Sequence, residues 1–240
     1  MKTIYPQVFL LHFAGGNAYS YQFLKQHFPV GIDYQSIELP GRGRRIGQSR
    51  ITRKDLAVDD LVKQIIELRN GEPYVLFGHS MGALLGLDVC REMEKLKDAP
   101  IRFIASGSAG PKTGENKHRY LMSKDQLKQE LRALGGIPEE VLQSAELYDF
   151  FEPIIRSDFE IIEAKSNWEN EIERIDTNIT CLMGSNEETV NEIENWKEYT
   201  SGEFSSSLYE GNHFFIYDHP REISSLIKKC YDSVEVHENK

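Results

Sequence analysis

The sequence predicts an α/β protein with a mostly parallel, doubly wound sheet, because short apolar strands alternate with longer amphipathic helices. Five runs are rich in β-branched or aromatic residues and nearly continuous in apolar character, as strands buried on both faces are. These runs are residues 7–13, 34–39, 74–78, 101–106 and 179–183, and residues 205–209 form a sixth strand-like run.

Two segments between the strands have helical periodicity. Residues 54–70 carry Ala57, Leu61, Ile65 and Leu68 at helical spacing. Residues 81–96 are also helical in pattern and apolar over most of their first three turns. Such helices can cover the faces of a parallel sheet, as the repeated strand–helix order requires.

The alternation breaks after Ser106, where a polar and helix-rich stretch begins. Ser123 is placed to cap a helix over residues 124–134, the glycines at 135–136 would end it, and Pro138 would open the next helix. We interpret residues 111–165 as a helical insertion within a single domain spanning residues 1–240. A separate small domain is the alternative.

Composition and charge exclude several classes of protein. With 28 Lys and Arg against 38 Asp and Glu, the net charge of −10 argues against nucleic-acid binding. A hydrophobic share of 40% predicts a folded core. Without a signal peptide or an apolar run long enough for a membrane helix, we expect a cytoplasmic protein with no membrane contact. The three cysteines are widely separated and predict neither a disulfide framework nor a metal site.

The sharpest chemical signal is the sequence Gly78-His79-Ser80-Met81-Gly82, which lies directly between a predicted strand and a predicted helix. A nucleophile at such a turn has a strained backbone, and glycines two residues before and after it remove side chains that would collide. Ser80 is therefore the candidate nucleophile, although an incidental turn serine is the alternative.

A general base must come from elsewhere, and in hydrolases of this kind the chain order is serine, acid, histidine. His213 lies in a loop between the sixth strand-like run and the last helix, at the sheet edge where we expect Ser80. His219 is better explained as a capping or surface residue. His79 should point away from the substrate side, and His12 follows a buried strand as a core histidine would.

The acid that would orient His213 is expected after the fifth strand, where Glu187 and Glu188 are adjacent. A carboxylate there could hold the imidazole in its productive tautomer. Glu187 is our choice and Glu188 the rival, and both could also be plain solvated acids.

Two backbone N–H groups are needed to stabilise an oxyanion. Met81, at the start of the helix after Ser80, is one candidate. The other is Ala14, or alternatively Phe13, in the loop Phe13-Ala14-Gly15-Gly16 after the first strand. Paired glycines allow the backbone to approach a substrate carbonyl closely. No step of this chemistry needs a cofactor or a metal ion.

Several short motifs, in order, resemble the type II thioesterases that accompany nonribosomal peptide synthetases and polyketide synthases. They extend nearly from end to end and comprise residues 13–16, 39–45 (LPGRGRR), 78–82 (GHSMG), 156–159 (RSDF), 196–198 (WKE) and 211–215 (GNHFF).

The resemblance implies an α/β-hydrolase fold with a helical lid, and hydrolysis of acyl groups from the phosphopantetheine arm of carrier proteins. Ser80 and His213 match the family's nucleophile and base. The family usually carries Asp in the Gly-x-x-Asp element, whereas this chain has Glu187. Because glutamate is one methylene longer, the loop must retreat to keep the hydrogen bond. A monomer is expected.

An acidic carrier protein would be repelled by the whole-molecule charge, so local basic patches should mediate docking. Residues 40–54 contain six basic residues and no acid, and residues 111–132 contain six basic and three acidic residues. Either stretch could face the carrier or its phosphate, or could be a solvated surface. A small-molecule esterase or lipase and a non-catalytic hydrolase-like binding protein are the alternative functions.

Overall fold

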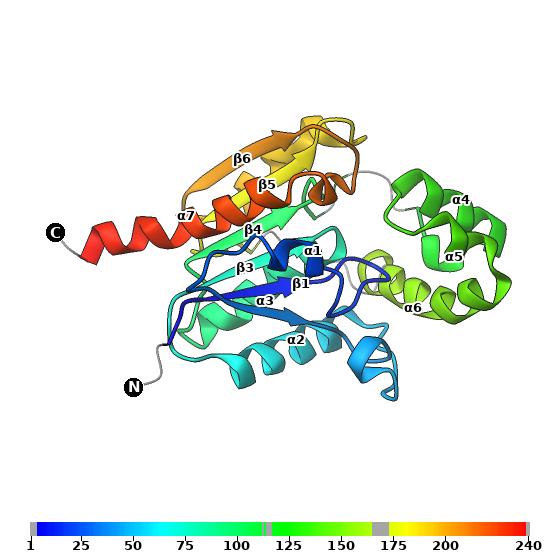
Figure 1. Cartoon of the computed structure of the whole chain (residues 1–240), viewed down its shortest axis with the longest axis horizontal. Coiled ribbons are helices and arrows are strands. Elements are labelled where there is room, and N and C mark those ends of the chain that lie inside the picture. Colours follow the sequence, from blue (N-terminus) through cyan, green and yellow to red (C-terminus); the bar gives the residue numbers. More distant parts are fainter. Residues whose placement is uncertain (1–3, 112, 114–116, 165–172, 239–240) are drawn as a thin grey trace.

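The protein is built on one six-stranded parallel sheet in the order β2-β1-β3-β4-β5-β6 (Figure 1). The computed structural model describes residues 4–111, 113, 117–164 and 173–238. The strands are β1 (Gln7–Leu11), β2 (Asp33–Ile37), β3 (Tyr74–His79), β4 (Arg102–Ser106), β5 (Ile179–Gly184) and β6 (Phe204–Tyr209). The predicted parallel α/β fold is confirmed, and the predicted strand ends differ from these by at most two residues.

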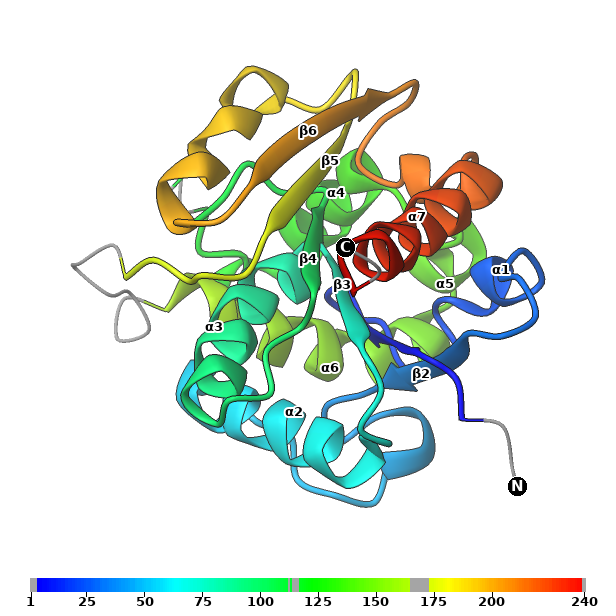
Figure 2. The same cartoon turned by 90° about the vertical axis from the view of Figure 1, so that its left-hand side faces the viewer.

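Helices cover both faces of the sheet, as Figure 2 shows from the side. They are α1 (Gln22–Lys25), α2 (Lys54–Leu68), α3 (Met81–Lys95) and α7 (Pro220–Glu238). Successive strand residues point to opposite faces. Accordingly, Phe9 and Leu11 pack in the core under α2 and α3, whereas Val8 and Leu10 pack in the core under α1 and α7. This double burial explains the continuous apolar runs in the strands.

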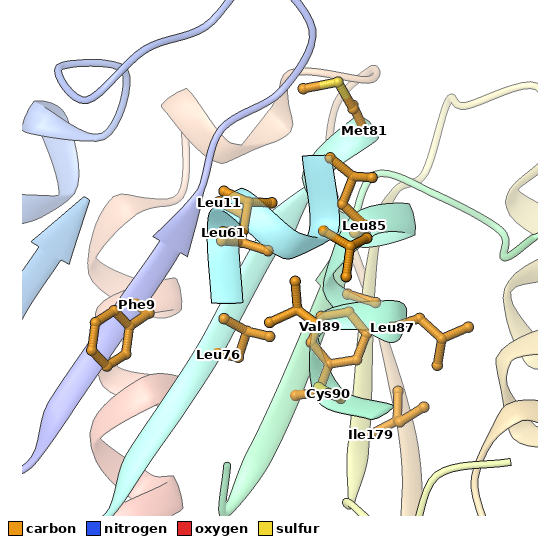
Figure 3. Packing of buried hydrophobic residues seen from close by; sticks show 14 of the residues in the cluster. Phe9, Leu11, Leu61, Leu76, Met81, Leu85, Leu87, Val89, Cys90 and Ile179 are labelled. Atoms are coloured by element: carbon orange, nitrogen blue, oxygen red, sulfur yellow. The ribbon is translucent and has the colours of Figure 1, made fainter. Parts of the chain in front are cut away.

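Helix α3 lies at the centre of the larger core (Figure 3). Its Leu85, Val89 and Cys90 pack in one cluster with Leu76 of β3 and Ile179 of β5. All five side chains are almost fully buried. The helix that begins directly after Ser80 is therefore held firmly against the sheet.

The segment between β4 and β5 forms a group of helices beyond the carboxyl ends of the strands (Figure 1). These are η2 (Arg119–Leu121), α4 (Lys124–Leu134), α5 (Glu139–Gln143) and α6 (Ala145–Glu163). The predicted cap is confirmed, because Ser123 and Gln126 form a reciprocal capping box and Gly135 ends α4. Of the predicted insertion, residues 112, 114–116 and 165 lie outside the described residues. Its assignment to a single domain stays a prediction.

Short 3₁₀ helices complete the fold, namely η1 (Gly43–Arg45), η4 (Val190–Tyr199) and η5 (Phe215–Tyr217). Trp196 of η4 is fully buried, and its indole N–H donates to the carbonyl of Ser108 at 2.8 Å. This contact joins the segment before β6 to the loop that leads from β4 into the insertion. Throughout the described ranges, every helix is too short or too polar to cross a membrane.

Candidate active site

Ser80 occupies a strained turn between β3 and α3. Its backbone angles are φ 55° and ψ −115°, a conformation that non-glycine residues rarely adopt. A Cβ at Gly78 would lie 2.0 Å from the carbonyl oxygen of Gly82, and a Cβ at Gly82 would lie 2.3 Å from that of Leu11. The two glycines are thus required by close backbone packing. The Ser80 N–H donates to the carbonyl of Ser106 at 2.7 Å, which ties the turn to β4.

His213 and Glu187 are hydrogen-bonded to each other. His213 Nδ1 donates to Glu187 Oε2 at 2.7 Å, and Glu187 Oε1 accepts the N–H of Gly184 at 2.8 Å. The carboxylate is 7% exposed and so is shielded from competing water. Because Nδ1 carries the proton in this bond, Nε2 is left as the basic nitrogen.

The rival acid, Glu188, points elsewhere. Its side chain is 87% exposed and lies 3.9 Å from the ammonium of Lys117. The structure therefore brings Glu187, and not Glu188, against His213. The loop after β5 accommodates the longer glutamate through a tight turn, in which the Glu187 N–H donates to the carbonyl of Gly184 at 3.1 Å.

Ser80 and His213 line one pocket of about 200 Å³ together with Ala14. They meet there because the carboxyl ends of parallel strands lie at one edge of the sheet. The rest of the wall is mostly apolar and comes largely from α4, α6 and the loop after His213. It includes Leu131, Leu134, Phe151, Ile155, Phe159 and Phe214. The insertion thus supplies an apolar wall opposite the serine, as expected for a lid.

The loop after β1 is held in one shape by two hydrogen bonds. Gly16 N–H donates to the carbonyl of Phe13 at 2.9 Å, and Gly15 N–H donates to Asp158 Oδ2 at 2.8 Å. Ala14 lies between these anchored peptides and lines the pocket. Met81 is the first residue of α3, where backbone N–H groups have no partner within the helix. Both candidate donors are therefore adjacent to the serine turn.

Sequence reasoning missed a buried ion pair behind this loop. Arg42 donates to both carboxylate oxygens of Asp158 at 2.5 and 2.7 Å, and neither side chain is more than 2% exposed. Arg42 belongs to the stretch 40–54 that is a candidate basic patch, but it is buried and so is not part of such a surface. Its partner is 116 residues away, so no local pattern indicates the pair. Both residues lie in motifs on which the family resemblance depends, LPGRGRR and RSDF. That is the one feature of the sequence that could have drawn attention to the pair.

The predicted basic patch at residues 40–54 is largely neutralised by acids that lie outside this stretch. Arg45 pairs with Asp60, Arg53 with Asp55, and Lys54 with Asp88. Among the residues that the structure describes, the side chains of Arg44 and Arg50 form no ion pair with a carboxylate. Residues 111–132 are similar, because Lys117, Arg119, Lys124 and Arg132 each pair with at least one glutamate or aspartate. Lys112 and Glu115 of that stretch lie outside the described residues.

Two further histidines, His12 and His79, are buried in the core. His12 is buried, donates from Nδ1 to the carbonyl of Phe13 and accepts the Leu39 N–H at Nε2. Burial, aided by the charge of Arg42, lowers the pKa of His12 from 6.5 to about 4. His79 is also fully buried, with Nδ1 2.9 Å from Ser106 Oγ, and burial lowers its pKa well below the usual value.

His219 is partly exposed and bonds through Nε2 to the carbonyl of Glu210 at 2.8 Å. Within the described part of the chain, His, Cys, Asp and Glu side chains form no group of three or more that could hold a metal ion.

Comparison with known proteins finds a matching family and several relatives. The family model of the thioesterase domain matches residues 6–231. A gramicidin S biosynthesis protein, GrsT of Aneurinibacillus migulanus, is 34% identical, and the match covers 93% of this chain and 88% of that protein. A probable cadicidin biosynthesis thioesterase of Streptomyces griseus is 30% identical over 90% of this chain and 60% of its own length.

Solved structures are similar over almost the whole chain. The type II thioesterase BorB from the borrelidin biosynthetic cluster is 28% identical, with a TM-score of 0.80 over 94% of this chain and 92% of its own. ClbQ from the colibactin NRPS/PKS pathway has a TM-score of 0.87 at 23% identity, over 97% of this chain and 99% of its own. At that identity the likeness shows the fold alone.

Proposed function

The chain belongs to the thioesterase domain family, and we propose that it is an editing enzyme that hydrolyses acyl thioesters from the phosphopantetheine arm of carrier proteins. The observation that carries this proposal is the 2.7 Å bond from His213 to Glu187 in the pocket that Ser80 lines. The relatives named for gramicidin S and cadicidin biosynthesis support the carrier-bound substrate.

In the proposed reaction, His213 Nε2 takes the proton of Ser80, and Oγ attacks the thioester carbonyl carbon. The oxyanion that forms is stabilised by the N–H groups of Met81 and Ala14. The C–S bond then breaks, the thiol leaves with the proton from His213, and an acyl-serine remains. His213 next removes a proton from water, which attacks the acyl-serine and releases a carboxylic acid. Glu187 keeps the imidazole oriented throughout.

The leaving group suits this machinery. A thiol has a pKa near ~8.5, so it departs more easily than an amine and needs less proton donation from His213. The apolar wall formed by Leu131, Phe151 and Ile155 would surround the acyl group. Closure of the pocket by the insertion would exclude bulk water from the acyl-serine.

The test is release of free acid from a defined acyl carrier protein by the wild-type chain and by Ser80→Ala. We expect Ser80→Ala to lose both turnover and covalent labelling by a fluorophosphonate. Ser20→Ala is the matched control, because Ser20 lines the same pocket but its hydroxyl accepts the Asn17 N–H at 2.9 Å. That variant should keep both.

Other outcomes would identify the alternatives. Faster turnover of a free aryl ester than of acyl carrier protein would indicate a small-molecule esterase. If Ser80 is not labelled and no substrate is turned over, the chain would be a binding protein with a hydrolase fold.

A further inference from the structure

A second hollow lies beside the pocket that Ser80 lines. It has a volume of about 420 Å³ and lies between the loop after β1, the η1 loop and helix α6. Gly15 and Phe151 line both hollows, so the two share a wall next to Ala14. We call this second hollow the η1 groove. The other residues that matter here are Tyr19, Arg44, Ile46 and Phe150.

Three large apolar side chains of the groove are open to solvent. Tyr19 is 53% exposed, Ile46 52% and Phe150 54%. They come from three different segments of the chain and meet at one hollow. Clustered exposed apolar surface of this kind is typical of a binding site, whereas single exposed side chains are ordinary. A narrow, uncharged segment of a ligand would cover this apolar surface.

The η1 groove also contains an arginine, Arg44, whose side chain forms no ion pair within the part of the chain that the structure describes. Ion pairs with acids occupy most basic residues of segment 40–54, which leaves Arg44 and Arg50 among the described residues. Arg44 lines the η1 groove. Its guanidinium lies 5.1 Å from the centre of the Tyr19 ring, and its Nε donates to the Tyr19 hydroxyl at 3.4 Å. The remaining guanidinium donors can therefore meet an anion.

The backbone on both sides of the groove is fixed by a buried carboxylate. Glu38, which is 3% exposed, accepts the N–H of Ala18 at 2.8 Å and the N–H of Arg44 at 2.6 Å. Tyr19 and Arg44 are therefore presented in a defined relation to each other. A preorganised cation loses less conformational freedom on binding than a free side chain would.

We infer that the η1 groove holds the phosphopantetheine arm, with Arg44 on its phosphodiester and the pantetheine chain over Tyr19, Ile46 and Phe150. This inference rests on the proposed function, because it places the arm of a carrier-bound thioester in the hollow next to the pocket that Ser80 lines. It also explains how an acidic chain could bind an acidic carrier protein in spite of charge repulsion. A chain with net charge −10 receives an anionic substrate through one unpaired arginine rather than through a broad basic face.

The test measures hydrolysis of three thioesters with the same acyl group. The thiol is the phosphopantetheine arm of a carrier protein, free phosphopantetheine, or pantetheine without phosphate. Replacing Arg44→Ala should lower kcat/KM about tenfold for the first two, mainly through KM, because a hydrogen bond to a charged group is lost. The kcat/KM for acyl-pantetheine should not change, because this substrate has no phosphate. Arg44→Lys should restore part of the loss, since it keeps the charge without the planar fork.

Arg50→Ala is the matched control, because Arg50 is an exposed arginine of the same basic segment and lies outside the groove lining. It should leave all three substrates unchanged. Equal losses on all three substrates with Arg44→Ala, or no loss on any, would overturn the inference. A loss confined to the carrier protein would also overturn it, because Arg44 would then contact the protein and not the phosphate. Failure of the proposed function is a separate result, in which the wild-type chain releases no acid from any of the three.

Discussion

The buried pair between Arg42 and Asp158 gives the sharpest prediction for stability. Replacing Asp158→Ala removes the partner of an arginine that is 1% exposed, and also removes the acceptor of the Gly15 N–H. Breaking a buried ion pair by deleting one partner costs about 3–5 kcal/mol, because a charge is left buried and unpaired. Native domains are stable by only about 5–15 kcal/mol, so about a fifth or more of the total is at stake.

Urea unfolding, followed by circular dichroism, measures this loss as a lower midpoint. The control is Glu139→Ala, which removes the partner of Arg132 in an exposed pair and should leave the midpoint unchanged. If Asp158→Ala unfolds at the same urea concentration as this control, the buried pair does not hold the insertion to the sheet and our reasoning is wrong.

A double variant separates stability from activity. Arg42→Met with Asp158→Leu leaves no unpaired charge, so it should recover most of the stability that Asp158→Ala loses. It cannot supply an acceptor for the Gly15 N–H, however, so the loop that carries Ala14 stays unanchored. We therefore expect kcat of the double variant to stay below the wild-type value although the fold is restored. Full recovery of kcat would show that the Gly15 contact has no part in catalysis.

Two further predictions concern titratable groups. Glu187→Gln should lower kcat about 10³- to 10⁴-fold, as loss of the orienting carboxylate does in the serine protease triad, while Glu188→Gln should leave kcat unchanged; equal effects would refute the assignment. The free energy of unfolding should fall as the pH drops from about 6.5 to about 4, because the unfolded chain protonates His12 and His79 whereas burial lowers their folded pKa values. His12 alone contributes roughly 3 kcal/mol, and urea midpoints that stay flat over this range would contradict the argument.

Local patterns in the sequence determined the elements and the serine turn. The apolar strands, the capping box at Ser123 and the glycines around Ser80 each act through neighbours a few residues away, so a linear reading could find them. His213 could also be placed, because a loop after a parallel strand must reach the same sheet edge as Ser80.

Only the tertiary structure decided between chemically equivalent residues. Glu187 and Glu188 are adjacent and identical in type, and the turn after β5 alone directs one to His213 and the other to solvent. Likewise, the partners of Arg42 and Arg45 are fixed by how distant elements pack, so a stretch that is basic in sequence is nearly neutral in space. Charge and catalytic geometry depend on three-dimensional neighbours, and those arise from packing that no short stretch of sequence specifies.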